Sequence, residues 1–480
     1  MDQPDAHAEQ PLYEWTATAL VAALRGKEIS AREVLAAHLE RIEETNPRVN
    51  AIVTLVADRA MARATAADEA AARGEWLGPL HGIPMAHKDN HLTAGIRTTF
   101  GSPARADFVP DTDDLVIERL KAAGVVTLGK TNIPEFAAGG HTFNPVFGIT
   151  RNPYDLSVTA GGSSGGAAAA LAAGMQPLAD GNDFGGSLRL PASFCNVIGL
   201  RPSAGRVPVH PAPDGYAGFS VQGPMARTVD DLALLLSVMA GPDRRAPNSL
   251  ERTGSDFAAV PSGGLLGKRI AFSVDLGGAI DVEPEITDIV RRAAASAAQA
   301  GAYVTEISPD FTGADECFRT LRAWQFEATQ GAFLEEHRDL VKRSLYANML
   351  TGRELTGAQV GAAAVHRTTL FHRMRTFLDA EGGFDALILP VTPLAAFGAE
   401  IEYPDVVAGQ PQPDYLGWMR AVCAVTVTGH PSISMPAGFT AAGTPIGVQL
   451  VGRHRAEDEL LGLAKGFEAV TGYARQRPAL

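Results

Sequence analysis

The chain has 480 residues, a net charge of −13, 46% hydrophobic residues, 50 glycines and three cysteines. This apolar content suffices for a folded core and excludes a disordered or fibrous chain, while the acidic balance argues against nucleic acid or an anionic membrane as the main partner. Three cysteines far apart in sequence exclude a disulfide framework and a CxxC zinc site, and they fit a reducing compartment.

The N-terminal part of the chain is predicted to be helical. Residues 1–7 are acidic and lack the apolar segment of a secretory signal, so we expect a cytoplasmic protein. Ser30 and Glu33 have the S-x-x-E spacing of a capping box, and apolar side chains follow at helical spacing. Pro47 is predicted to end that helix.

Beyond this segment, short β-rich runs alternate with helical stretches. The expected strands are Ala51–Val56, Ile83–His87, Val125–Leu128, Arg269–Val274, Ala302–Ile307, Ala386–Leu389, Ser432–Met435 and Ile446–Val451. The expected helices include Leu115–Ala123, Val229–Met239, Glu285–Ala300 and Glu457–Val470. This alternation predicts a layered α/β fold with a largely parallel or mixed sheet.

Two short motifs suggest ligand sites that their surroundings do not support. Residues 124–131 match the phosphate-loop pattern G-x-x-x-x-G-K-[ST], but a helix precedes them and β-formers occupy the middle, which favours a helix end followed by a buried strand. His87 and His91 have a spacing that could bind zinc on a helix. The residues before them predict a strand, where the two side chains would lie roughly 13 Å apart, so we interpret them as unrelated histidines.

A third motif, G-x-S-x-G at residues 161–165, matches the nucleophile elbow of α/β-hydrolases. The preceding residues 156–160 make a poor central strand for that fold. The glycine-rich run leads instead into an alanine-rich helix, where backbone N–H groups converge.

Three segments together suggest acyl transfer. Lys88 follows an apolar strand, where burial would lower its pKa and supply a neutral amine as a base. Ser163 lies in the glycine-rich loop. The segment 183–187 forms a second tight turn that ends in Ser187, and consecutive N–H groups in such a turn can hold an oxyanion beside the serine.

These segments resemble the amidase signature family of serine hydrolases, which use a Ser–cis-Ser–Lys triad. The similarity is unbroken from Gly161 to Val207 and extends over most of residues 20–470. Further matching stretches are Leu80–Asn90, Gly129–Asn132, Thr150–Pro153, Leu389–Pro393 and Gly447–Leu450. The resemblance displaces the α/β-hydrolase interpretation.

The resemblance implies the roles of the site residues. Ser187 is the expected nucleophile, Ser163 follows a cis peptide bond and bridges to Ser187, and Lys88 is the expected base. The oxyanion is expected to bind backbone N–H groups of the turn, and three further residues are expected to support the triad. The oxyanion residues are Phe184, Gly185 and Gly186 together with Ser187, and the supporting residues are Asp183, Arg189 and Ser164.

Departures from the family pattern occur beside these residues. The family often has threonine where Asn182 stands, and apolar residues where His87 and His91 stand. None of the three is expected to touch the triad. We expect Asn182 to alter the surroundings of the triad and His87 to tune the pKa of Lys88.

The resemblance also implies one large α/β/α domain over residues 1–480, whereas length alone suggests about three domains. Its central sheet is expected to be mixed, mostly parallel, twisted and covered by helices. Residues 1–75 would form a helical segment, 76–210 the signature core with the triad, and 211–480 the variable pocket region and the strands that complete the sheet. No metal or cofactor is implied. The expected partner is a small amide or carbamate, and we expect a monomer or homodimer that binds neither nucleic acid nor membrane.

The substrate pocket is expected to include Gly139, Gly140 and Phe143. The second half offers aromatic residues and gives no indication of an arginine that would clamp a substrate carboxylate. We therefore predict a hydrolase of neutral or aryl amides, similar to promiscuous amidases, aryl acylamidases and urethanases, with anilides and carbamates as candidate substrates.

Two alternatives remain open. One is the glutamine-hydrolysing component of a tRNA-dependent amidotransferase, which releases ammonia from glutamine with partner subunits and has tyrosines around its substrate arginine, whereas Gly352–Arg375 contains no tyrosine. The other is an inactive scaffold that serves as a binding module, which the intact triad argues against.

Overall fold

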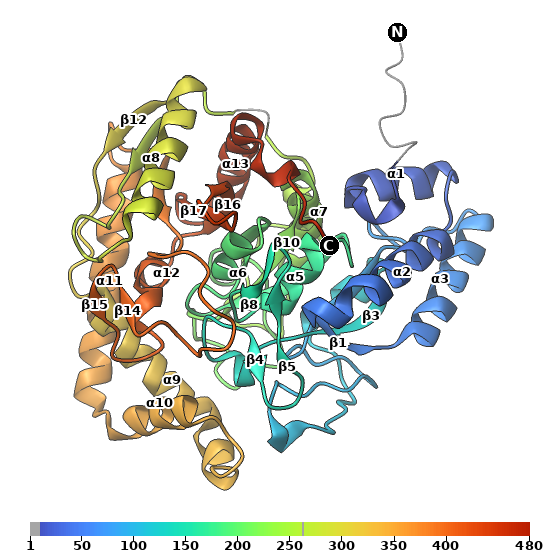
Figure 1. The fold of residues 1–480 in the computed structure, drawn as a ribbon, viewed down its shortest axis with the longest axis horizontal. Coiled ribbons are helices and arrows are strands. Elements are labelled where there is room, and N and C mark those ends of the chain that lie inside the picture. Colours follow the sequence, from blue (N-terminus) through green and yellow to red (C-terminus); the bar gives the residue numbers. More distant parts are fainter. Residues whose placement is uncertain (1–9, 262–263) are drawn as a thin grey trace.

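The computed structural model describes residues 10–261 and 264–480, so the prediction for residues 1–7 lies outside the described residues. A three-stranded sheet with the order β1-β3-β2 stands beside the N-terminal helices on the right of Figure 1. Strand β2 is parallel to β3, and β1 is antiparallel to it. The elements are α1 (Ala17–Gly26), α2 (Ala31–Val49), β1 (Ile52–Leu55), α3 (Ala57–Ala72), β2 (Pro84–Lys88), α4 (Leu115–Ala122) and β3 (Val126–Thr131).

An eight-stranded sheet forms the centre of the molecule, with the order β12-β11-β13-β17-β16-β9-β10-β8. Its strands come from both halves of the sequence. They are β8 (Leu178–Asp183), β9 (Ile198–Arg201), β10 (Val221–Ala226), β11 (Arg269–Phe272), β12 (Tyr303–Glu306), β13 (Ala386–Pro390), β16 (Ser432–Phe439) and β17 (Pro445–Val451). Three two-stranded sheets complete the strands: β4 (Phe143–Asn144) with β5 (Gly148–Ile149), β6 (Arg151–Asn152) with β7 (Asp155–Thr159), and β14 (Val406–Val407) with β15 (Gln410–Pro411).

The α/β class and the mixed sheet are confirmed, but the expectation of mostly parallel strands is wrong. Strand β11 is parallel to β12 and β13, and the other pairings of the large sheet are antiparallel. Strands β16 and β17 show why, because a connection of only five residues joins them and a short turn allows only antiparallel pairing. Alternation of strands and helices in sequence does not determine strand direction.

The helices beyond the N-terminal segment form two groups, one of which packs against the large sheet. Helix α13 contacts α7, α8 and the sheet, while α6 packs against α5 and strands β9, β16 and β17. The helices α9, α10, α11 and α12 pack beside one another, on the left of Figure 1. The bounds are α5 (Gly165–Ala172), α6 (Arg189–Phe194), α7 (Val229–Met239), α8 (Pro284–Gln299), α9 (Ala314–Glu336), α10 (Arg343–Glu354), α11 (Gly357–Asp379), α12 (Arg420–Thr428) and α13 (Glu457–Thr471).

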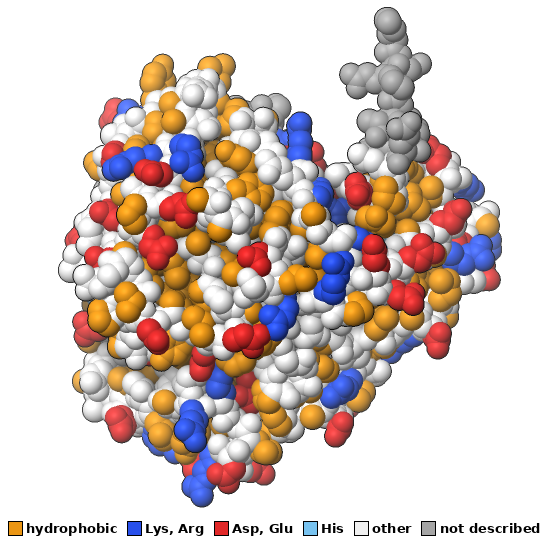
Figure 2. All heavy atoms as spheres, viewed as in Figure 1, with side chains coloured by type: hydrophobic (Ala, Val, Ile, Leu, Met, Phe, Trp, Pro, Cys, Tyr) orange, Lys and Arg blue, Asp and Glu red, His pale blue; other side chains and the backbone are white. Residues whose placement is uncertain are grey.

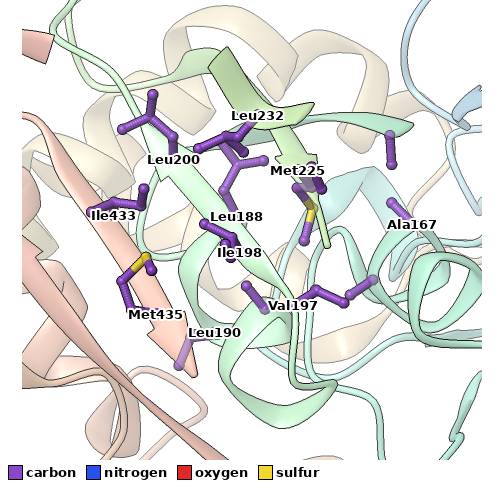
Figure 3. Close-up of a cluster of buried hydrophobic side chains, with 14 of the residues drawn as sticks. Ala167, Leu188, Leu190, Val197, Ile198, Leu200, Met225, Leu232, Ile433 and Met435 are labelled. Atoms are coloured by element: carbon purple, nitrogen blue, oxygen red, sulfur yellow. The ribbon is translucent and has the colours of Figure 1, made fainter. Parts of the chain in front are cut away.

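A continuous cluster of buried apolar side chains extends from Ala17 to Phe467. Leu188 and Leu190, which follow the Ser187 turn, lie within this cluster beside side chains of β9, β10 and β16 (Figure 3). Both leucines are fully buried. The start of α6, and with it the turn that carries Ser187, is therefore anchored in the core.

Helix α2 shows one further difference from expectation. Ser30 and Glu33 form the predicted capping box, but the helix continues past Pro47 to Val49 and ends at Asn50 in the left-handed conformation. The Asn46 side chain accepts hydrogen bonds from the N–H groups of Ala51 and Ile52. The C-terminal end of the helix is thus stabilised beyond the proline.

Charged side chains of both signs are interspersed with apolar ones on the face shown in Figure 2. Among residues 10–261 and 264–480, no helix is both long enough and apolar enough to cross a membrane.

Candidate active site

Lys88 lies at the end of β2, a strand whose five residues are all buried. Its Nζ atom is 2.8 Å from Ser163 Oγ, 2.8 Å from Ser164 Oγ and 2.7 Å from Asn182 Oδ1. The carbonyl oxygen of Asn182 lies 3.3 Å away. The structure therefore brings the predicted base and the predicted bridging serine into direct contact.

Burial lowers the pKa of Lys88 to about 7, although the carboxylates of Asp183 and Asp180 act in the opposite direction. A buried ammonium loses hydration, so the neutral amine is favoured. At neutral pH a substantial fraction of Lys88 can accept a proton, which is the property that a general base requires.

Ser163 and Ser164 precede α5, and the Gly162–Ser163 peptide bond is cis. Both serines are fully buried. The Ser164 N–H donates to the carbonyl of Ser187 at 3.1 Å, which connects the glycine-rich loop to the predicted nucleophile turn. The glycine-rich loop thus contacts Lys88 through its serine side chains and the Ser187 turn through a backbone hydrogen bond.

Asp183 organises the turn that ends in Ser187. Its carboxylate accepts from the N–H of Gly186 at 2.8 Å and of Leu188 at 3.2 Å. Arg189 donates to both carboxylate oxygens at 3.1 Å, and Arg201 donates at 3.2 Å. Burial raises the pKa of Asp183, but the two guanidinium groups outweigh burial and hold this pKa well below its ordinary value. The carboxylate stays ionised and fixes the turn.

The turn presents backbone N–H groups beside a serine that is 5% exposed. Gly186 has φ +98, and a Cβ there would come within 2.4 Å of Val422, so this position requires glycine. Because the Gly186 N–H donates to Asp183, it is already engaged, and an oxyanion role for Gly186 would require that hydrogen bond to be shared. Phe184, Gly185 and Ser187 supply the other N–H groups predicted for the oxyanion.

The interpretation of His87 and His91 as unrelated histidines is wrong, because both contact the same carboxylate. His87 Nδ1 lies 2.5 Å from one oxygen of Asp180, and His91 Nδ1 lies 2.9 Å from the other. Strand β2 ends at Lys88, and the following turn returns His91 to the same carboxylate. Within the described part of the chain, no three or more His, Cys, Asp or Glu side chains are arranged to hold a metal ion.

Asn182 also differs from expectation, because it contacts the triad through the 2.7 Å bond to Lys88 Nζ. The sequence shows only an amide in place of the family's common threonine. The signal that could have located it is strand periodicity: Asp180 and Asn182 are two residues apart on β8, so both side chains point to the same face, towards β2.

The three predicted pocket residues lie close to the glycine-rich loop or to Lys342, which is partly buried. Gly140 packs against Gly162, and a Cβ at Gly140 would come within 2.5 Å of the Trp418 ring. Phe143 lies in β4, with the Lys342 ammonium 5.2 Å from its ring centre. Gly139 lies near the same ammonium.

Arg322 is a buried cation that the sequence did not indicate. Its guanidinium lies 5.2 Å from the ring centre of Phe184 and 4.5 Å from that of Phe326, and it donates to Tyr415 Oη at 2.8 Å. Arg322 and Phe326 are one turn apart on α9, a spacing that could have indicated a shared face. The sequence provides no indication of an arginine clamp for a substrate carboxylate, and the guanidinium of Arg322 is engaged by Tyr415 and aromatic rings.

Comparison with known proteins identifies the family of this chain. The amidase family model matches residues 33–461. The chain belongs to the amidase signature family. This amidase is 36% identical over 474 residues to an acylamidase from Rhodococcus erythropolis, and the match covers 98% of both chains.

Two further comparisons cover nearly the whole amidase chain. It is 38% identical over 494 residues to the A component of the glutamyl-tRNA(Gln) amidotransferase from Moorella thermoacetica, covering 98% of this chain and 99% of that protein. The crystal structure of a bacterial aryl acylamidase superposes with a TM-score of 0.91 and 30% identity, covering 97% of this chain and 98% of that one. The protein is an amide-hydrolysing enzyme.

A cavity of about 490 Å³ lies elsewhere in the amidase. Its lining comes mainly from residues 276–280 and 308–316, and neither Lys88, Ser163 nor Ser187 contributes to it. This cavity is therefore separate from the candidate active site.

Ser163 and Ser164 form a matched pair for mutagenesis, since both hydroxyls are 2.8 Å from Lys88 Nζ. If Ser163 carries the proton between Ser187 and Lys88, Ser163→Ala lowers kcat of this amidase by roughly 10²- to 10⁴-fold, the range expected for a lost proton-transfer group. Ser164→Ala should lower kcat less than about tenfold, because its hydroxyl is outside the proton path. The measurement is kcat of both variants by steady-state kinetics. An equal loss in the two variants, or a larger loss in Ser164→Ala, would contradict the assignment of Ser163 to the proton path.

Proposed function

We propose that this amidase is a hydrolase of neutral aryl amides and anilides that works through an acyl-enzyme on Ser187, and that it also cleaves aryl carbamates. The observation that carries the proposal is the buried Lys88 amine, which contacts Ser163 at 2.8 Å and has its pKa lowered by burial to about 7. This arrangement supplies a base in the form of a lysine amine in contact with a serine hydroxyl.

The proposed reaction begins with proton transfer. Ser187 gives its hydroxyl proton to Ser163, and Ser163 gives its own to Lys88 Nζ, while Ser187 Oγ forms a bond to the substrate carbonyl carbon. Backbone N–H groups of the turn stabilise the resulting oxyanion. Lys88 then returns a proton through Ser163 to the leaving nitrogen, and the C–N bond breaks. Water repeats the sequence on the acyl-enzyme and frees Ser187.

Aromatic surroundings support the choice of aryl substrates. Phe184 stacks on Phe219 with ring centres 5.3 Å apart and meets Phe318 edge-on at 5.9 Å. Phe219 and Phe318 are buried and Phe184 is partly buried, so these rings form an aromatic cluster beside the Ser187 turn. The similarity to an acylamidase and to the structure of an aryl acylamidase supports the same substrate class.

A second candidate function is glutamine hydrolysis as one component of a tRNA-dependent amidotransferase that has further subunits. The observation that favours it is Arg322, a buried cation beside Phe184 that could attract the carboxylate of glutamine. The similarity to the Moorella thermoacetica amidotransferase component supports it as well. Against it, the Arg322 guanidinium already donates to Tyr415 and lies against aromatic rings.

A substrate panel tests the proposal. The purified protein is incubated with anilides, primary amides, aryl carbamates and glutamine, and products are quantified by liquid chromatography. We expect kcat/KM for anilides to exceed that for glutamine by at least about a hundredfold, because the two charged groups of glutamine must lose their hydration on entering a buried site. Release of ammonia from glutamine as the preferred reaction, alone or with tRNA, would overturn the proposal.

A further inference from the structure

Lys88 has more hydrogen-bond partners than a proton-accepting amine needs. A neutral amine has two N–H groups and one lone pair, and only the lone pair can take a proton. Asn182 Oδ1 at 2.7 Å and the Asn182 carbonyl at 3.3 Å can only accept hydrogen bonds. They therefore direct the N–H groups of Lys88 towards themselves and leave the lone pair for a serine hydroxyl.

The orientation of the Asn182 amide depends on His91. Asp180 accepts from the Lys88 backbone N–H at 2.9 Å and faces His91 Nδ1 at 2.9 Å. Burial raises the pKa of Asp180, but the facing His87 and His91 outweigh it, and the net pKa lies far below its ordinary value. An ionised carboxylate requires the proton of His91 on Nδ1, which leaves the lone pair on Nε2.

His91 Nε2 lies 3.5 Å from Asn182 Nδ2. A lone pair at this position attracts the NH₂ group of the amide and not its oxygen. The amide oxygen is consequently turned towards Lys88. Burial also lowers the pKa of His91, although Asp180 opposes this, so the neutral ring persists at the pH where Lys88 works.

We propose that His91 and Asn182 are positioning residues for the base: His91 orients the Asn182 amide, and Asn182 holds the N–H groups of Lys88 so that its lone pair faces Ser163. This assignment rests on the proposed function of Lys88 as the base. It gives a role to two residues at which the chain departs from its family's common pattern.

His91, Asn182 and Lys88 together form what we call the positioning relay. The charged groups around this relay come from several elements. The loop after β2 supplies His91 itself. Lys130 of β3 donates to the carbonyl of His91 and to Thr93 and Thr98. The titratable groups that act on Lys88 or His91 are Lys130 from β3 and Asp180 and Asp183 from β8, and His87 from β2 contacts Asp180.

Asn182→Asp tests the relay through the pH profile. A carboxylate in place of the amide stabilises the ammonium form of Lys88, so the base is protonated up to higher pH. We expect the midpoint of the acid limb to rise by about one to three pH units, with activity recovering above it. A purely structural residue would lower the rate without moving this midpoint, so an unchanged midpoint overturns the proposal.

His91→Asn and His87→Asn form a matched pair. Asparagine keeps a donor near the position of Nδ1, so both variants retain their contact with Asp180 and lose only the Nε2 side of the ring. His91 Nε2 faces Asn182, whereas His87 Nε2 lies 3.1 Å from Thr127 on β3. We expect roughly a tenfold lower rate on the high-pH plateau for His91→Asn and less than about a twofold change in that plateau rate for His87→Asn, because the effect expected of His87 is on the pKa of Lys88 and hence on the pH midpoint. Equal effects of the two variants contradict the relay.

A double variant tests whether His91 acts through Asn182. In the Asn182→Leu background, adding His91→Asn should change the rate less than about twofold, because the amide that His91 orients is already absent. If the two effects multiply, His91 acts by another route and the relay is wrong.

A second measurement, the rate of covalent labelling, tests the role of His91 and Asn182 independently of the proposed substrate class. The rate at which a fluorophosphonate labels the serine nucleophile reports its activation without any amide substrate. Wild-type protein that labels rapidly but hydrolyses no anilide would refute the substrate proposal, while the variants would still test the relay. Thermal unfolding of each variant identifies losses that arise from misfolding.

Discussion

Ser187→Ala is expected to abolish hydrolysis of every amide that the wild type cleaves, with a loss on the order of 10⁶-fold. The variant removes the atom that forms the acyl-enzyme while leaving the turn in place, because Asp183 holds the turn through the backbone N–H groups of Gly186 and Leu188. The measurement is anilide hydrolysis with the variant at high concentration, together with fluorophosphonate labelling.

Ser193→Ala is the matched control for Ser187→Ala. Ser193 lies on α6, is fully buried, and accepts a hydrogen bond from the Gly447 N–H at 2.8 Å. Its removal should cost about 1 kcal/mol of folding stability and leave kcat nearly unchanged. If Ser187→Ala retains more than about a thousandth of the wild-type rate, Ser187 is not the nucleophile.

Lys88→Ala is expected to lower kcat by at least about 10⁴-fold, because the proton of the nucleophile then has no acceptor in the buried site. In the wild type, kcat/KM should rise with pH through about 7, since Lys88 loses its proton over that range and becomes a base. In Lys88→Ala no such rise should occur. Recovery of the variant at pH values roughly one to three units above this pKa would show that another group acts as the base.

Lys88→Arg serves as the control for charge and size. Arginine keeps a positive charge at all accessible pH values and cannot accept the proton. We expect it to be as inactive as Lys88→Ala. An active Lys88→Arg variant would mean that Lys88 provides charge and not proton transfer.

Much of the fold could be predicted from local pattern. The expected strand Ala386–Leu389 corresponds to β13, and the expected helix Val229–Met239 corresponds to α7. The strand is a short apolar run and the helix is an amphipathic stretch, and each has clear ends. Predicting these two elements therefore required no information about which residues contact them in the fold.

Strands β8, β9 and β10 were missed because their sequences lack that pattern. Strand β8 ends in the residues Asp180 to Asp183, which are typical of turns, and it is covered by packing from β2 and α5. Strand β10 contains Gly223 and Pro224. Its pairing with β9 is restricted to Met225 and Ala226, so Pro224 has no partner on that side and the proline is tolerated.

The residues of the candidate site also fall into two groups, those that local motifs predict and those that only the structure identifies. Lys88, Ser163 and Ser187 could be found because each lies in a contiguous motif with its own glycines. Asn182 and Arg322 were not assigned to the site, because local spacing indicates only the face on which each lies, while their roles arise from contacts with side chains distant in the chain: Asn182 with Lys88 and Arg322 with Tyr415. A single sequence records residue types along the chain and not which of them meet across a sheet.

The most direct test of the acyl-enzyme mechanism is the identity of the residue that becomes covalently modified. The wild-type protein is treated with a fluorophosphonate, digested, and the modified peptide is sequenced by mass spectrometry. The mechanism predicts the adduct on Ser187, with Ser163 and Ser164 unmodified. An adduct on Ser163, at the centre of the G-x-S-x-G motif, would contradict the mechanism and make Ser163 the nucleophile.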